Sequence, residues 1–143
     1  MKWTYDDGGR ELAGFKGKTG DCACRAVAIA TGKPYREVYD ALNALGATER
    51  PSKRRRGRSS SRTGYHGVTL RKYLSSLGYQ WTPTMQIGAG CTTHLRDGEL
   101  PKGRLVAFVS KHYCAVIDGV IHDIFDPSRG GNRCVYGYFT VTP

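Results

Sequence analysis

The chain has 143 residues, of which 39% are hydrophobic, a composition that suits one globular domain and excludes a disordered tail. Lys and Arg together number 22 against 12 for Asp and Glu, a net charge of +10 that favours a polyanionic partner. The sequence has no apolar run near the roughly 20 residues of a membrane-spanning helix, and residues 1–7 lack the apolar stretch of a signal peptide. We therefore expect a single domain over 1–143 of a cytoplasmic protein without membrane contact, its five cysteines mostly free thiols.

The N-terminal half predicts three helices after a short strand or arm at 3–5. Apolar side chains recur at helical spacing in three stretches, each followed by a glycine. The expected helices cover 22–31, 34–45 and 68–77. The first helix has Asp21 as its N-cap and a single charge, Arg25, so it should be buried on most sides. We expect Arg25 to pair with Asp21 or Glu37.

Between the second and third helices, residues 47–63 are dominated by Arg, Lys, Ser and Pro and predict an exposed loop, here called the basic loop. Its candidate contacts to a polyanion are Lys53, Arg54, Arg55, Arg56, Arg58 and Arg62. A flexible strip of cations contacts phosphates but does not read bases. Any binding of nucleic acid through 50–62 should therefore be non-specific and salt-dependent.

The C-terminal half predicts strands. The expected ranges are 79–83, 105–109, 112–117, 120–125 and 134–141, with one helical turn near 93–97 in the loop that follows the first of them. Asp118-Gly119 is a strong signal for a two-residue hairpin turn. Helices followed by an antiparallel sheet indicate the α+β class.

The hairpin decides which side chains face one another. Counting outward from its two-residue turn, four residues should share one face of the sheet: His112, Cys114, Asp123 and Phe125. Asp123 would then lie diagonal to His112, near enough for its carboxylate to reach the imidazole. Asp126 is the alternative partner of His112 if the strand ends before Pro127.

Cys22 is the candidate nucleophile, because the positive end of a helix dipole stabilises a thiolate in the first turn. His112 would act as its base, and Asp123 would orient His112. Cys24 is the second candidate for the nucleophile. Cys22, Cys24, His112 and Cys114 could also be considered as zinc ligands, but structural zinc usually has ligands more widely spaced, and we predict neither a metal nor a cofactor.

These residues resemble those of papain-like cysteine peptidases, and most closely the short phage-encoded members. Asp21-Cys22 opens a buried helix, His112 opens a strand, and Asp123-Ile124-Phe125 ends the next strand, so the resemblance spans about 15–141. It implies helices, one of them central and buried, packed on a C-terminal antiparallel sheet, with Phe125 shielding the bond between His112 and Asp123.

The resemblance also implies an activity, that of a thiol hydrolase acting on a peptide or protein substrate as a peptidase, isopeptidase or amidase. Lys16 stands where papain-like enzymes have the glutamine of the oxyanion hole, which leaves the Cys22 backbone N–H, helped by Thr19 or Lys16, as the donor. The alternative function is a papain fold without catalysis that binds nucleic acid or an acidic protein through the basic loop.

Overall fold

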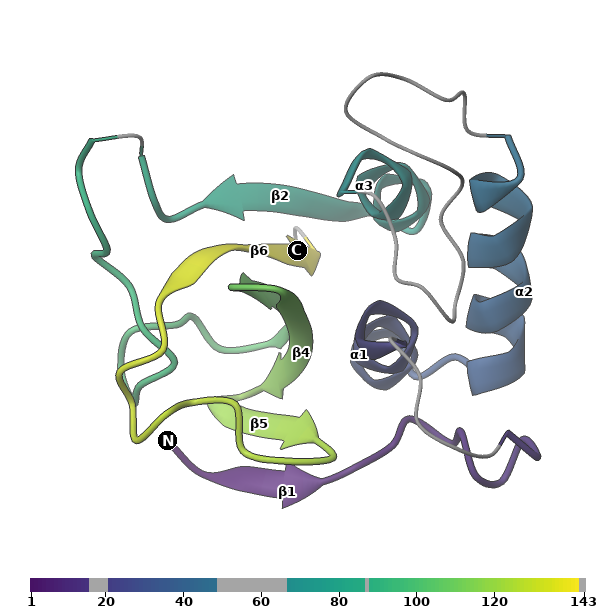
Figure 1. Cartoon of the computed structure of the whole chain (residues 1–143), viewed down its shortest axis with the longest axis horizontal. Coiled ribbons are helices and arrows are strands. Elements are labelled where there is room, and N and C mark those ends of the chain that lie inside the picture. Colours follow the sequence, from purple (N-terminus) through teal and green to yellow (C-terminus); the bar gives the residue numbers. More distant parts are fainter. Residues whose placement is uncertain (16–20, 49–66, 87, 142–143) are drawn as a thin grey trace.

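The computed structural model describes residues 1–15, 21–48, 67–86 and 88–141. In these residues three helices pack against a six-stranded mixed sheet, an α+β arrangement (Figure 1). The elements are β1 (Trp3–Tyr5), α1 (Cys22–Thr31), α2 (Tyr35–Gly46), α3 (Gly67–Ser76), β2 (Tyr79–Pro83), β3 (Arg104–Val109), β4 (His112–Ile117), β5 (Val120–Asp123) and β6 (Val135–Val141). Among the described residues, each helix is too short or too polar to span a bilayer.

The sheet has the strand order β1-β5-β4-β3-β6-β2 and is antiparallel except at one edge. There β1 runs parallel to β5, with Trp3 opposite Ile121. The C-terminal strands β2 to β6 are antiparallel as expected, and the unexpected addition of the N-terminal strand makes the sheet mixed. The N–H of Ile121 donates to the Lys2 carbonyl (3.0 Å), and the N–H of Asp6 donates to the Asp123 carbonyl (2.9 Å). Both distances are typical of backbone hydrogen bonds. No tight turn joins β1 to β5, so the direction of pairing is free of the hairpin constraint.

The β4–β5 hairpin follows the predicted register, with Ile117 opposite Val120 across the turn at Asp118-Gly119. Both turn residues have positive φ, 48° at Asp118 and 81° at Gly119, as a type I′ turn requires. The strand β5 ends at Asp123, two residues before the predicted end.

The helices form where the apolar periodicity predicts them. Gly32 takes the left-handed conformation (φ 75°) after α1 and its N–H donates to the Ala28 carbonyl. Gly46 was expected to stop α2 but belongs to it, because the next residue, Ala47, keeps helical dihedrals. Asp21 precedes α1 as expected, yet its carboxylate makes no capping bond, because it is committed to other buried partners described below.

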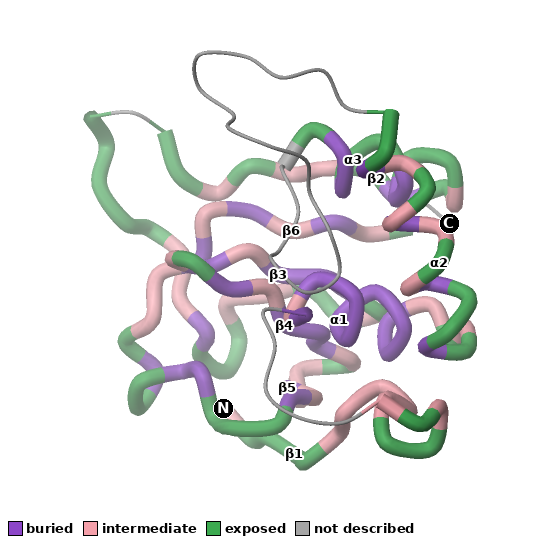
Figure 2. Tube along the Cα trace, turned by 45° about the vertical axis from the view of Figure 1, so that its right-hand side comes forward, coloured by how far each residue is buried: buried purple, intermediate pink, exposed green. Residues whose placement is uncertain are grey.

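Two apolar clusters lie on the two sides of the sheet. The buried helix α1 packs on β4, β3 and β5, and its residues from Ala23 to Ala30 are all buried (Figure 2). The second cluster includes Leu105, Val116 and Ile121, and it is completed by Leu95 from the connection between β2 and β3. This connection therefore serves as a cover for the second cluster.

The connection between β2 and β3 differs from its prediction in two ways. The expected helical turn near 93–97 is absent, because His94 forms an isolated antiparallel bridge with Cys134. Cys134 is in turn joined to Cys91 by a disulfide, which was not predicted, although most of the cysteines are free as expected: Cys22, Cys24 and Cys114. The two partners lie 43 positions apart, and no CxxC spacing indicates their pairing.

Gly137 in β6 generates a first prediction. A Cβ atom at this position would lie 2.4 Å from the Trp81 ring and 2.8 Å from the Thr82 carbonyl oxygen. Gly137→Ala should therefore lower the free energy of unfolding by about 1–3 kcal/mol through overpacking, measured by urea denaturation. The cost should be smaller in a Trp81→Leu background. An equal cost in both backgrounds would show that the ring contact is not its cause.

Candidate active site

Three element ends meet at the candidate site. Cys22 is the first residue of α1, His112 the first of β4, and Asp123 the last of β5. His112 Nε2 lies 2.6 Å from Asp123 Oδ2, and both residues are buried. Asp123 Oδ1 accepts a bond from the Ile124 N–H (2.7 Å). The carboxylate is therefore held at both oxygens, and it fixes the imidazole through Nε2.

The Cys22 thiol interacts with the other side of this imidazole. Because Nε2 is bonded to Asp123, Nδ1 is the ring nitrogen that remains for Cys22. Burial by itself raises the pKa of Cys22, but hydrogen bonds from His112 and from the Tyr113 backbone, together with the charges of His112 and Arg25, lower the pKa below its ordinary value. The position in the first turn of α1 adds the field of the helix dipole.

The pKa of His112 moves in the opposite direction. Burial lowers it, but hydrogen bonds to Asp123 and Cys22 and the charges of the same two groups raise it to about 9. A low pKa for the thiol and a high one for the imidazole favour proton transfer between them. The site is therefore suited to hold a thiolate–imidazolium pair near neutral pH.

Phe125 and Asp126 take different positions around His112. The Phe125 ring centroid lies 5.1 Å from that of His112, and Phe125 is 45% exposed, so it packs over the buried imidazole from the solvent side. Asp126 is exposed and its Oδ1 accepts the Ser128 N–H (3.0 Å). Asp123, the first choice of the two acids, is thus the residue that contacts His112.

The other free cysteines differ from Cys22. Cys24 is buried, donates its S–H to the Tyr35 carbonyl (3.9 Å), and has its pKa raised to about 12, chiefly by burial. Burial likewise raises the pKa of Cys114. Cys24 and Cys114 also belong to the apolar clusters on opposite sides of the sheet, so they do not converge with Cys22 and His112 on one metal ion.

A network of buried charged residues adjoins the candidate site. Arg25 forms an ion pair with Asp21 Oδ1, and its Nη2 lies 3.7 Å from Asp123 Oδ1. Asp21 Oδ2 accepts the Tyr35 hydroxyl (2.7 Å) and lies 3.1 Å from Arg10 Nε. Arg25 therefore joins the start of α1 to the end of β5. Of the candidate catalytic residues, Arg25 forms an ion pair with Asp123, and its charge also contributes to the lowered pKa of Cys22.

The sequence indicates only part of this network. Asp21 and Glu37 were the two expected partners of Arg25. Asp21 pairs with it, whereas Glu37 contacts Lys33 (3.4 Å). The contacts of Arg25 with Asp123, and of Asp21 with Arg10 and Tyr35, were not foreseen. A lone charge on an apolar helix does indicate that buried partners exist, but it does not say which distant residues they are.

Several predicted residues lie outside the described part of the chain. They include Thr19 and Lys16, which were expected near the oxyanion, and most of the basic loop. The polyanion contacts among them are Lys53, Arg54, Arg55, Arg56, Arg58 and Arg62. Oxyanion stabilisation by Thr19 and polyanion binding by the loop therefore stay predictions.

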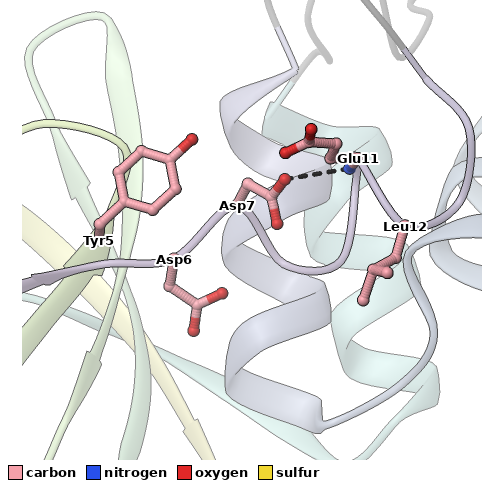
Figure 3. Close-up of a pocket in the computed structure, with 5 residues that line it drawn as sticks. All are labelled: Tyr5, Asp6, Asp7, Glu11 and Leu12. Atoms are coloured by element: carbon pink, nitrogen blue, oxygen red, sulfur yellow. Dashed lines mark hydrogen bonds between the residues drawn. The ribbon is translucent and has the colours of Figure 1, made fainter.

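A hollow near the N-terminus is separate from these residues. It is lined by Tyr5, Asp6, Asp7, Glu11 and Leu12 (Figure 3). Its aspartates bond to the local backbone: Asp6 accepts the Gly8 N–H (2.9 Å), and Asp7 accepts the N–H of Glu11 (3.0 Å). These carboxylates stabilise the turn, and none of the candidate catalytic side chains lines the hollow.

The Arg25 network generates a second prediction. Arg25→Met leaves Asp21 and Asp123 buried with one cation fewer, so the free energy of unfolding should fall by about 3–5 kcal/mol, measured by urea denaturation. The matched control is Arg36→Met, because Arg36 pairs with Asp40 at the surface (3.4 Å), and its cost should stay below about 1 kcal/mol. Equal costs would contradict a special role for Arg25.

The pKa shifts generate a third prediction, on alkylation of Cys22 by iodoacetamide. Only the thiolate reacts with iodoacetamide, so the rate should increase with pH as Cys22 loses its proton. The midpoint of this increase should lie below the ordinary thiol pKa of about 8.5, because the pKa of Cys22 is lowered. His112→Ala removes the hydrogen bond and the charge by which His112 lowers the pKa of Cys22. The midpoint of the rate against pH should therefore move to a higher pH. Peptide mass spectrometry measures the rate at Cys22 against pH.

His122→Ala is the control for this labelling, because His122 is half-buried and contacts Asp6 (3.4 Å). It should leave the midpoint unchanged. A midpoint that does not respond to His112→Ala would show that His112 does not activate the thiol.

Comparisons with known proteins do not assign this chain to a family. Searches against protein-family models, curated proteins and solved structures find no match. The resemblance to papain-like peptidases therefore stays an inference from the sequence, and the functional argument depends on the contacts of Cys22, His112 and Asp123.

Proposed function

We propose that this protein is a thiol hydrolase of the papain-like type, which cleaves an acyl bond in a peptide, isopeptide or other amide. The observation that carries the proposal is the 2.6 Å contact between His112 Nε2 and Asp123 Oδ2, on an imidazole that also bonds to a half-buried thiol of lowered pKa. A nucleophile, a base and an orienting group in this relation are the parts that nucleophilic catalysis requires.

In the first half of the reaction, the Cys22 thiolate attacks the carbonyl carbon and the carbonyl oxygen becomes an oxyanion. The Cys22 backbone N–H, which has no acceptor within α1, is a suitable donor to that oxygen. The His112 imidazolium then gives its proton to the leaving amine. The C–N bond breaks and a thioester on Cys22 remains.

In the second half, a water molecule attacks the thioester while His112, now neutral, accepts its proton. The carboxylic acid leaves and the Cys22 sulfur departs as a thiolate, which restores the pair with the protonated His112. Asp123 holds Nε2 in both halves, so that Nδ1 faces the sulfur. Phe125 limits the access of water to the bond between His112 and Asp123.

A fourth prediction tests this chemistry with a p-nitrophenyl ester as a general acyl donor. The wild type should release a burst of about one p-nitrophenolate per chain, as acyl-enzyme formation requires, and intact-mass and peptide analysis should find the acyl group on Cys22. Cys22→Ala should lose the burst, and His112→Ala should slow it by about 10²–10⁴-fold.

The two acids supply a matched pair for the same assay. Asp123→Asn should slow acylation, because it weakens the hold on His112, whereas Asp126→Asn should leave the rate unchanged. Acylation of Cys24 instead of Cys22, or a burst that survives Cys22→Ala, would refute the proposed mechanism. A protein that lacks a burst but binds nucleic acid would favour the alternative function through the basic loop.

A further inference from the structure

A second group of chemically active side chains lies away from the candidate active site, where the connection between β2 and β3 meets the start of β6. Cys91 and Cys134 are joined as a disulfide, and the Cys91 sulfur lies 3.6 Å from His94 Nε2. One imidazole nitrogen thus lies beside a pair of bonded sulfurs. None of these residues takes part in the proposed hydrolysis.

His94 is oriented towards the sulfur by a carboxylate. Its Nδ1 lies 3.1 Å from Glu99 Oε1, and its backbone N–H donates to the same oxygen (3.2 Å). A proton held on Nδ1 by Glu99 leaves Nε2 with a lone pair on the side of the Cys91 sulfur. Histidines that bind metals are commonly held in this way by a carboxylate on their other ring nitrogen.

The backbone beneath the group is fixed before any ligand arrives. His94 and Cys134 stand opposite each other in an antiparallel bridge. The bridge is flanked by bonds from the Leu95 N–H to the Arg133 carbonyl (2.9 Å) and from the Val135 N–H to the Thr93 carbonyl (2.8 Å). The two ligand-bearing segments therefore depend on this bridge as well as on the disulfide for their alignment.

We propose that, once the disulfide is reduced, Cys91, His94 and Cys134 form a binding site for a thiophilic metal ion such as Zn²⁺, with Glu99 orienting His94. In the structure, where the disulfide is closed, the described residues hold no group of three such side chains placed for a metal ion. Reduction is needed because a thiolate, and not a disulfide sulfur, is the zinc ligand. Thiolate and imidazole donors suit zinc and disfavour magnesium or calcium.

The chemistry balances with a dithiol as reductant. The dithiol transfers two electrons and two protons to the disulfide, which yields two thiols and the cyclic disulfide of the reductant. Binding of Zn²⁺ then releases both thiol protons to solvent. Cys91 is exposed, so the ion can enter from solvent, and water can occupy the fourth coordination position.

The test uses the full chain, reduced with a dithiol and freed of it under argon, with Co²⁺ as the spectroscopic probe and Zn²⁺ for calorimetry. We expect a thiolate-to-cobalt charge-transfer band in the reduced protein and none in the oxidised protein. The band should vanish in Cys91→Ser and Cys134→Ser and persist in Cys22→Ser. Glu99→Gln should weaken Zn²⁺ binding by about 10–100-fold.

His94→Asn and Glu99→Gln keep both cysteines, so they test the site even if loss of a cysteine disturbs folding. Absence of the band in the reduced wild type, its survival in Cys91→Ser, or equal binding by the oxidised protein would overturn the proposal. So would unchanged affinity in His94→Asn. These outcomes are separate from those for acylation, because the two sites share no residue.

Discussion

The buried guanidinium of Arg25 is the constraint on which the candidate site depends. A charge on an otherwise apolar, buried helix is costly unless carboxylates neutralise it. Arg25 meets this requirement with Asp21 at the start of its own helix and with Asp123 at the end of β5. Because Arg25 pairs with both carboxylates, it links the end of β5 to the start of α1. The carboxylate that it holds there is the one that holds His112.

The three free cysteines show that neighbours, and not burial, determine the character of a thiol in this protein. Burial raises the pKa of all three. Only Cys22 has an imidazole, a backbone N–H and a guanidinium near enough to reverse the effect. When Cys22 is a thiolate and His112 an imidazolium, the buried network holds three positive and three negative charges. The cations are His112, Arg25 and Arg10, and the anions are Cys22, Asp21 and Asp123. The ion pair therefore fits the site without leaving a buried charge uncompensated.

The contact between His112 and Asp123 could be predicted from the sequence because it follows from a local rule. A two-residue turn fixes the register of the hairpin, and the register fixes which side chains are neighbours. The contacts of Asp21 with Arg10 and Tyr35, and the parallel pairing of β1, depend on contacts between distant segments that leave no periodic pattern. The same holds for the disulfide, whose cysteines meet because a backbone bridge aligns 94 with 134. Local geometry was therefore predictable where a turn encodes it, and contacts made only after the chain folds were not.

The two proposed sites, at Cys22 and at Cys91 with Cys134, both depend on the redox state of their cysteines. Hydrolysis through Cys22 requires a reduced thiol, since an oxidised sulfur cannot attack a carbonyl carbon. Cys24, the nearest cysteine in sequence, bonds to the Tyr35 carbonyl from within the core, so it is not placed to protect Cys22 as a disulfide partner. Cys91 and Cys134 do protect each other. A medium reducing enough to open that disulfide also keeps Cys22 as a thiol. Under the two proposals, the hydrolase and the metal site are therefore both available in the reduced protein, and an oxidant removes both together.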